Sequence, residues 1–192
     1  MTNNNISGYF PRYKLEYDYR FKQVLTFCYI TSKSNDMYVF LRKKKDRKIA
    51  LVGGHVDYDL SVFNMSPNYY LVNNLIKEIL EEIKIIDKRT NIQLSTKELL
   101  LSQATIEPKI FVNEDETDYS LRNVAFIYKV ELNTEKLLSR YMFYSNEEKE
   151  HDVEIMTLEQ LQLNPENSEQ NFMVQFVPKI VLRSILSNSY QT

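Results

Sequence analysis

The sequence has little of several residue types that carry structure or chemistry. Its 192 residues include one cysteine, two histidines, three glycines and no tryptophan. The lone Cys28 lies in the apolar stretch QVLTFCYI, so a disulfide within the chain and a cysteine-rich zinc centre are excluded. A single reduced core thiol is typical of a reducing compartment, so we expect a cytoplasmic protein.

Long hydrophobic runs and a strong charge of one sign are also absent. No apolar stretch is long enough to span a bilayer, and the start, MTNNNISGYF, lacks the basic and apolar regions of a signal peptide. The net charge of −2 gives no overall attraction to nucleic acid or to anionic membranes. We therefore expect no membrane partner, and other partners must be inferred from local sequence.

What is present is typical of a globular protein: 43% hydrophobic and 26% charged residues. A chain of this length buries one core well, and no internal repeat or low-complexity linker marks a second domain. We therefore predict a single domain, 1–192, that begins with an irregular arm at 1–21.

Alternating, β-branched and aromatic segments predict the strands. The first two strands flank the polar turn Ser32 to Asp36 and are expected to form a hairpin. Between 99 and 112, Pro108 is expected to break the strand in two. The predicted strands are 23–31, 37–42, 48–52, 99–106, 110–112, 124–132 and 153–156.

Helices are predicted at 67–83, from Thr157 onward and at 168–186. Ser66 and Pro67 are typical of an N-cap and a first helical position. The segment from Thr157 to Gln160 fits a capping box, and Pro178 is expected to kink or split the last helix. Strands on both sides of a central helix predict an α/β fold with a mixed β-sheet packed between helices.

The central helix carries its glutamates on one side. At about 100° per residue, Glu81 and Glu82 lie within about 60° of Glu78, and the aliphatic residues gather nearly opposite. Like charges one turn apart repel, so the spacing gives the helix no stability. Magnesium takes oxygen ligands, usually one or two carboxylates with waters and phosphates, and would remove this repulsion. The alternative is an ordinary solvated helix face, because adjacent glutamates are common on surface helices.

Two adjacent glycines precede this helix. Gly53 and Gly54 allow backbone conformations, and a close approach to metal or phosphate, that a side chain would block. His55 follows and either assists a phosphate or packs at the strand start. The basic run 42–48 either contacts phosphate or forms a solvated hairpin tip, and its lack of interleaved aromatic residues favours the tip.

Residues 53–57, GGHVD, and residues 77–85, KEILEEIKI, resemble the Nudix box, GX5EX7REUXEEXGU, in which U is a bulky aliphatic residue. The resemblance implies a strand-loop-helix segment over 53–85 within a Nudix-like α/β/α sandwich. It also implies a metal-dependent pyrophosphohydrolase that uses magnesium or manganese. By resemblance, Glu78, Glu81 and Glu82 take the places of the metal-binding glutamates and serve in catalysis.

The sequence departs from the box at several positions. Lys77 replaces an arginine whose bidentate fork orients the neighbouring glutamates, which lysine cannot copy. Lys84 replaces the glycine that ends the helix, so that turn must be built differently. The loop is about nine residues longer than in the box, and Leu60 stands at the first glutamate position, with Asp57 and Asp59 as the nearest acids. A variant with GGH and a lengthened loop does occur in the family.

Further candidates come from other segments. Members of the family often recruit a catalytic base from a later loop, so Glu147, Glu148 and Glu150 are candidates beside the box glutamates. The acidic loop 113–118 either supplies a ligand or base or is simply solvated. The candidates for substrate contacts are Gly53, Gly54, His55, Arg42 and Arg122.

The predicted function is hydrolysis of the pyrophosphate bond in a nucleoside diphosphate linked to another moiety, with a small-molecule nucleotide as substrate. ADP-ribose, sugar nucleotides, dinucleotide polyphosphates, oxidised nucleotides and capped RNA all fit this chemistry. The substitutions at Lys77 and Lys84 favour an alternative, a catalytically weak or inactive nucleotide-binding sensor or scaffold. An RNA-binding protein that uses the basic run is a third hypothesis. The sequence leaves open whether the chain forms a homodimer.

Overall fold

The structure is a computed structural model that describes residues 23–45, 47, 49–56, 67–99, 104–112 and 123–163. Several features of the sequence analysis lie outside these residues: the arm at 1–21, the loop insert at 58–65, the acidic loop at 113–118 and the helix at 168–186. The candidates Asp57, Asp59 and Arg122 lie outside them as well.

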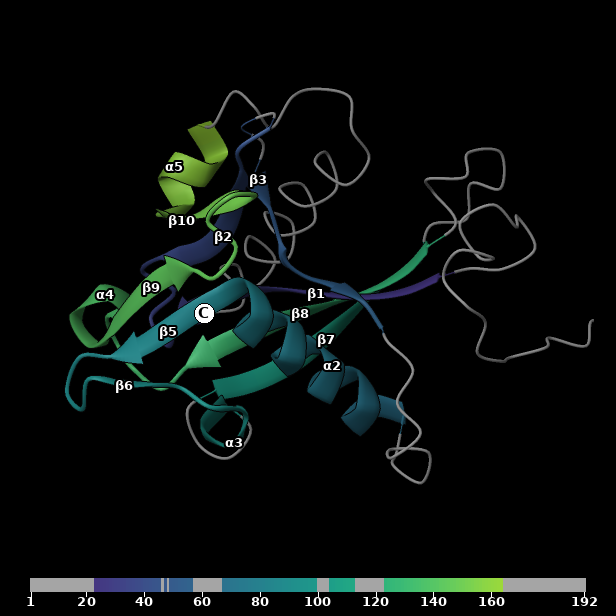
Figure 1. The fold of residues 1–192 in the computed structure, drawn as a ribbon, viewed down its shortest axis with the longest axis horizontal. Coiled ribbons are helices and arrows are strands. Elements are labelled where there is room, and N and C mark those ends of the chain that lie inside the picture. Colours follow the sequence, from purple (N-terminus) through teal and green to yellow (C-terminus); the bar gives the residue numbers. More distant parts are fainter. Residues whose placement is uncertain are drawn as a thin grey trace, which may run out of the picture.

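The larger sheet is mixed, and its strand order is β10-β2-β1-β8-β7 (Figure 1). The central strand β1, Gln23–Ser32, runs parallel to β8, Asn123–Leu132, along its whole length. The other neighbours are antiparallel, and β2, Tyr38–Lys43, forms the predicted hairpin with β1. The edge strands are β10, His151–Met156, and β7, Ala104–Val112.

Two short strands complete this sheet and bring the glycine pair into it. β3, Ile49–Ala50, pairs with β2, and β4, Val52–His55, pairs with the first half of β1. In this register Gly53 lies opposite Phe27 and Gly54 lies opposite Thr26. Both glycines are therefore paired residues of a strand, beyond the end of the strand predicted at 48–52.

A second, three-stranded sheet has the order β6-β5-β9. Its central strand β5, Ile83–Asp87, follows helix α2 without a loop and pairs with β6, Ile92–Gln93, and β9, Tyr141–Ser145. The sequence analysis missed β5, although IKIID alternates buried and partly buried residues along the strand. Ile83 and Ile85 are fully buried. The predicted helix extends to Ile83, which continues the helical spacing of Ile76 and Ile79, and no element was predicted for 84–87.

The larger sheet is buried on both faces, as the predicted sandwich requires. Cys28 and Ile30 of β1 pack in a core with Leu75, Ile76 and Ile79 of helix α2, Pro67–Glu82. The intervening side chains of β1, such as Phe27 and Tyr29, belong to a second core that contains Leu161 of helix α5, Leu158–Leu163. A mixed sheet between helices on two faces confirms the predicted fold class (Figure 1).

Helix α2 begins at Pro67, as expected, and ends at Glu82. Asn146, the residue after β9, donates hydrogen bonds to the last carbonyls of the helix. Its backbone N–H donates to Glu82 O at 2.9 Å. The Asn146 side-chain amide donates to Leu80 O at 2.8 Å. Asn146 thus replaces the helix-ending glycine, whose position is occupied by Lys84.

The segment around Pro108 differs from the prediction. β7 continues through Pro108, which pairs with Tyr128 of β8. Proline is tolerated there because β7 is an edge strand, so one side of its backbone has no ladder to satisfy. The predicted strand at 99–106 is wrong at Leu99, which has helical φ and ψ as the C-cap of a short helix α3, Thr96–Glu98, and is found from Ala104 onward; residues 100–103 lie outside the described ranges.

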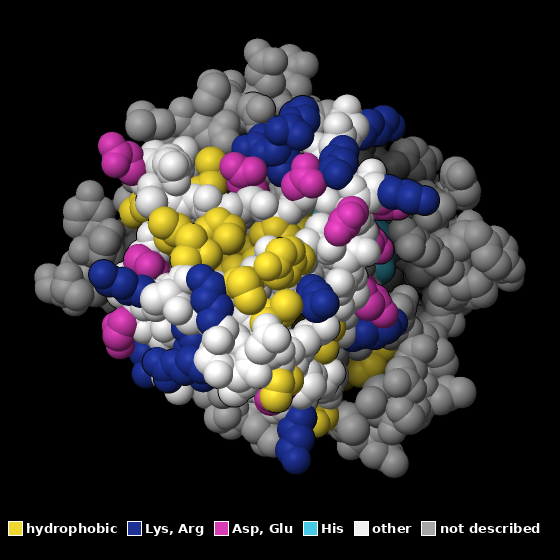
Figure 2. Space-filling model, turned by 60° about the vertical axis from the view of Figure 1, so that its left-hand side comes forward, with side chains coloured by type: hydrophobic (Ala, Val, Ile, Leu, Met, Phe, Trp, Pro, Cys, Tyr) yellow, Lys and Arg dark blue, Asp and Glu magenta, His cyan; other side chains and the backbone are white. Residues whose placement is uncertain are grey.

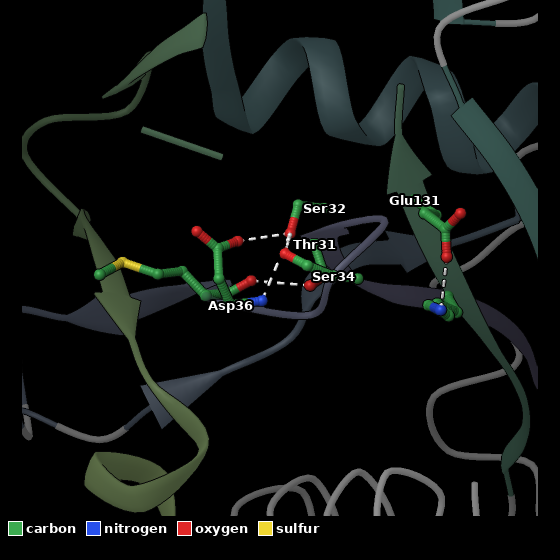
Figure 3. A network of polar contacts seen from close by, with 7 residues as sticks. Thr31, Ser32, Ser34, Asp36 and Glu131 are labelled. Atoms are coloured by element: carbon green, nitrogen blue, oxygen red, sulfur yellow. Dashed lines mark hydrogen bonds and ion pairs between the residues drawn. The ribbon is translucent and has the colours of Figure 1, made fainter. Parts of the chain in front are cut away.

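The turn between β1 and β2 is held by a polar network (Figure 3). The Ser32 hydroxyl donates to the Asp36 carboxylate, and the Asp36 backbone N–H donates back to Ser32 Oγ at 3.3 Å. The Asp36 carboxylate also lies 3.4 Å from the N–H of Leu137, the first residue of helix α4, Leu137–Arg140. This network is well satisfied and connects the hairpin to the small sheet, so we assign it a structural role.

The helix predicted from Thr157 onward is confirmed as α5. Thr157 and Gln160 form a reciprocal capping box at the start of α5, with hydrogen bonds of 2.8 and 3.2 Å. No helix in the described ranges is long and apolar enough to cross a membrane. Figure 2 shows basic and acidic side chains interspersed around a central hydrophobic area on one face of the molecule.

Candidate active site

Gly53 occupies a position that only glycine fits. Its φ of +131° is rarely adopted by residues with a side chain, and a Cβ would lie 2.1 Å from the backbone oxygen of Thr26. The backbone of β4 therefore lies so close to the backbone of β1 at Gly53 that no side chain fits between them. This close pairing brings the Gly53 backbone N–H toward the end of helix α2.

Gly54 makes room for a side chain of the helix. A Cβ at this position would lie 2.6 Å from Glu78 Oε2. The missing side chain therefore leaves room for the Glu78 carboxylate against the strand. The two glycines of the predicted box and two of its glutamates, Glu78 and Glu82, meet at this contact between α2 and β4.

Glu82 is the most perturbed carboxylate of this contact. Its Oε2 accepts a hydrogen bond of 2.7 Å from the Gly53 backbone N–H. Burial raises the pKa of Glu82 to about 8, although the Gly53 hydrogen bond opposes this rise. The nearby carboxylates of Glu78 and Glu147 raise this pKa further, and the Lys43 ammonium lowers it. A raised pKa caused by burial and by like charges is typical of functional sites.

Glu81 is placed differently from the other two helix glutamates. Its side chain is 55% exposed, and Oε1 lies 3.8 Å from Lys77 Nζ one helical turn away. Lys77 thus contacts Glu81 through a point charge rather than the planar fork of an arginine. Within the part of the chain that is described, no group of three His, Cys, Asp or Glu side chains is close enough to hold a metal ion. The helix glutamates are therefore not gathered around one point.

A cleft of about 720 Å³ opens beside Glu82. Its lysines come from two places: Lys43 ends β2 and is followed by Lys44 and Lys45, and Lys149 follows β9. The sequence analysis favoured a solvated hairpin tip for the basic run, but three of its lysines line this cleft. The other lining residues are Phe27, Leu41, Ala50, Leu51, Gly53, Glu82, Glu147, Glu150 and His151.

The two lysine-bearing loops are fixed to each other. The backbone N–H of Lys44 donates to Glu150 O at 2.8 Å, and Lys44 Nζ lies 3.2 Å from Asp152 Oδ1. Both side chains of this ion pair are largely exposed, so the pair adds little stability. The backbone hydrogen bond is the stronger constraint, and it places the basic and acidic walls of the cleft side by side.

Among the later glutamates, Glu147 is the one that acts on Glu82. Glu147 and Glu150 line the cleft, whereas Glu148 lines a neighbouring hollow that also contains Lys84 and Tyr144. Of these three glutamates, the structure therefore favours Glu147 as the one that interacts electrostatically with Glu82.

Arg42 and His55, the other described candidates for substrate contacts, lie on β2 and β4. The Arg42 side chain donates from Nε to Glu154 Oε2 at 2.9 Å and from its guanidinium to Arg47 O at 2.6 Å. These bonds join β2 to β10 and favour a structural role, so we leave Arg42 out of the proposed binding set. His55 lies at the end of β4, opposite Leu25 of β1, and is partly exposed.

The residues of this site fit a hard divalent cation. Glu78 and Glu82 supply oxygen donors beside the adjacent glycines Gly54 and Gly53, and the Glu78 carboxylate acts electrostatically on Glu82. Magnesium is commonly held by one or two carboxylates with the rest of its shell made of water and phosphate. Burial is the main cause of the raised pKa of Glu82, the Glu78 and Glu147 carboxylates add to it, and a cation held by Glu78 and Glu82 would lower this pKa.

The site and the sandwich define a class of mixed α/β domains in which a glutamate-bearing helix packs on a glycine strand. No family model matches the chain, and no curated protein matches it. Solved structures do match. A candidate Nudix hydrolase, Tm1382, is 18% identical with a TM-score of 0.62, over 91% of this chain and 78% of that chain.

Two further solved structures agree. The Nudix domain of NrtR from Shewanella oneidensis, in complex with ADP ribose, is 10% identical with a TM-score of 0.51, over 90% of this chain and 96% of that chain. A bifunctional NMN adenylyltransferase/ADP ribose pyrophosphatase from Francisella tularensis is 14% identical with a TM-score of 0.55, over 91% of this chain and 44% of that chain. The chain has the Nudix fold. At sequence identities this low, the structural similarity establishes the fold and not the activity.

Proposed function

We propose that the chain is a metal-dependent hydrolase that cleaves a pyrophosphate bond in a nucleoside diphosphate linked to another moiety. The observation that carries this proposal is the buried Glu82 carboxylate, which is held by the Gly53 N–H and lies beside Glu78 and Glu147. Glu82 and Glu147 also line the cleft that contains the lysines, and a purely structural helix end has no need for such a group of carboxylates.

The lysines supply the means to bind phosphate. Lys43, Lys45 and Lys149 present ammonium groups around one cleft, and ammonium groups bind phosphate oxygens as point charges. The buried apolar residues Phe27 and Leu41 give the same cleft a surface suited to a nucleoside. A substrate with both parts, an anionic diphosphate and a flat base, matches this lining.

Glu78 and Glu82 would hold the cation, and Glu81 would join them from the same helix face once its side chain leaves Lys77. A bound magnesium or manganese ion would neutralise charge on the bridging phosphates and lower the pKa of an attacking water. One neighbour of the same fold, the Francisella bifunctional protein, is known in complex with AMP and a manganese ion.

The reaction is attack of water on one phosphorus of the pyrophosphate. A new P–O bond forms, the bridging P–O bond breaks, and the leaving phosphate takes the electron pair. Glu147 is our candidate to accept the proton of the water, because it lines the cleft and faces Glu82. The products would be a nucleoside monophosphate and a phosphorylated remainder.

A nucleotide-binding sensor without turnover is the second candidate. The placement of Glu81 beside Lys77, away from the glycine strand, is the observation that favours it. The NrtR Nudix domain, which has the same fold, is known with bound ADP ribose. In both functions a small nucleotide is the partner.

Turnover on a panel of nucleoside diphosphate conjugates, with magnesium or manganese, separates the two candidates. For the hydrolase we expect metal-dependent release of a nucleoside monophosphate, reduced about 100-fold or more by Glu82→Gln. Glu81→Gln on the same panel tests whether the third glutamate takes part. Glu159→Gln on α5, an exposed carboxylate away from the cleft, is the matched control. Nucleotide binding without turnover on any conjugate would contradict the hydrolase and support the sensor.

A further inference from the structure

The turn between β9 and β10, residues 145–151, is more highly constrained than a connecting loop requires. The backbone N–H groups of Glu150 and His151 both donate to Glu147 O, at 2.8 and 3.1 Å. At its start, Asn146 is bound to the end of α2 through its backbone and its side chain. The turn is therefore fixed to the helix that carries Glu82.

His151 is buried within this turn. It is 5% exposed, and its Nδ1 lies 3.0 Å from Ser145 Oγ. Its other nitrogen, Nε2, is buried and lies 3.3 Å from Glu147 Oε2 without the alignment of a hydrogen bond. A buried ring nitrogen in this state is uncommon, because burying a polar group without a hydrogen bond costs free energy.

The hydrogen bonds of Ser145 leave its hydroxyl available as a donor to the ring. Ser145 Oγ accepts from the Glu147 backbone N–H at 3.1 Å, and its own hydrogen can be donated to His151 Nδ1. With Ser145 as the donor, the proton of the neutral ring is on Nε2, the nitrogen that faces Glu147. A small rotation of the Glu147 carboxylate completes a chain from Ser145 through His151 to Glu147.

We propose that His151, supported by Ser145 and Asn146, is a positioning residue that holds the Glu147 carboxylate beside Glu82. This inference rests on the proposed function, and it assigns His151 no contact with substrate. Asn146 fixes the turn to the helix, and Nε2–H of His151 directs the carboxylate that it faces. Loss of the histidine would leave Glu147 in the cleft but free to rotate away from the attacking water.

The test compares His151→Leu with His151→Gln. Leucine fills the space without a donor, whereas the glutamine amide places an N–H near the former position of Nε2. We expect His151→Leu to lower kcat about 10- to 100-fold with KM changed less than about threefold, and His151→Gln to recover part of that loss. Ser145→Ala is expected to lower kcat by less. Ser139→Ala, which removes a hydroxyl that donates to Lys136 O on α4, is the matched control.

A second readout does not depend on activity. The chain has two histidines, so a long-range ¹H–¹⁵N spectrum of the imidazoles contains two sets of signals, and His151→Gln identifies those of His151. We expect the Nε2–H tautomer for His151 and a shifted Nε2 signal in Glu147→Gln. Identical His151 signals in the wild type and in Glu147→Gln would overturn the inference.

The two readouts separate this inference from the proposed function. If the wild type turns over and His151→Leu does so equally well, the inference is wrong and the hydrolase stands. If the wild type turns over nothing on the panel, the proposed function is wrong, and the imidazole spectrum alone decides whether His151 directs Glu147.

Discussion

The two sides of helix α2 contribute to the protein in opposite ways. On one side Leu75, Ile76 and Ile79 are fully buried in the core between the helix and the larger sheet. On the other side Glu82 is held in a partly buried position beside Glu78, with its pKa raised to about 8. Each buried aliphatic side chain contributes about 1.5–3 kcal/mol to folding, whereas the raised pKa means that the Glu82 carboxylate opposes it.

The apolar side thus contains residues that stabilise the fold, and the acidic side contains a carboxylate whose charged form lowers the free energy of unfolding. The apolar side holds the helix in place, and the acidic side uses that placement to bring carboxylates to a glycine strand. Sites that are destabilised in this way are common where chemistry requires charge that the protein alone does not neutralise. Variants on the two sides of α2 and on β4 test the comparison.

Gly53→Ala should have the largest effect. The new Cβ would meet the backbone oxygen of Thr26, which is part of the paired strand and has no room to move. We expect a loss of about 4 kcal/mol in the free energy of unfolding, measured by urea denaturation. Gly54→Ala is the control, because its Cβ meets the movable carboxylate of Glu78 rather than backbone. Equal losses in both variants would contradict the assigned packing.

Ile79→Ala should come next. Ile79 is fully buried on the apolar side, so the variant loses its transfer free energy and leaves a cavity. We expect a loss of about 2–4 kcal/mol, with nucleotide binding retained where the variant is folded. The exposed residue Lys77 on the same helix provides the comparison, since Lys77→Ala should change stability by less than about 1 kcal/mol.

Glu82→Gln should stabilise the protein above pH 8. The pKa of Glu82 rises from 4.5 to about 8 on folding, so the folded state binds more protons than the unfolded state between these values. Stability attributable to this group therefore falls as pH rises from about 4.5 to 8 and stays low above it. We expect a gain of about 1–3 kcal/mol for the variant at pH 9 and little change at pH 4. A variant that is less stable than the wild type at pH 9 would contradict this assignment.

Glu81→Gln should have the smallest effect on stability. Its carboxylate is mostly exposed, and its ion pair with Lys77 at 3.8 Å is the kind that contributes little. We expect a change of less than about 0.5 kcal/mol in thermal or urea unfolding. A larger loss would mean that Glu81 is part of the packed contact between α2 and β4.

Much of the fold could be predicted from the sequence because its signals are local. The β-branched and aromatic residues of β1 and β8, the proline at the start of α2 and the Thr157 capping box are each visible in a few neighbouring residues. The strand β5 was missed because its first residue, Ile83, continues the helical spacing of Ile76 and Ile79, and because its pairing with β9 is not local. The break expected at Pro108 was wrong because edge position is a property of the whole sheet.

The site was predicted in part for the same reason. The glutamate spacing and the glycine pair are visible along the chain, and they identified Glu78, Glu82, Gly53 and Gly54 as one group. The grouping of Lys43 with Glu147 and His151 depends on the pairing of β2 with β10, which joins segments more than one hundred residues apart. A lone buried histidine gives no sequence signal that distinguishes it from a core residue.

The most direct test of this account is a pH titration of the Gly53 amide. The chain has three glycines, so selective ¹⁵N-glycine labelling gives a spectrum of few signals, and Gly53 is assigned by its response to Glu82→Gln. Because the Gly53 N–H donates to Glu82 Oε2, its chemical shift should follow the protonation of that carboxylate. We predict a midpoint near pH 8, the raised pKa of Glu82, and loss of the transition in Glu82→Gln. A midpoint near 4.5, or an amide that does not respond to Glu82, would contradict the buried carboxylate on which the proposed site depends.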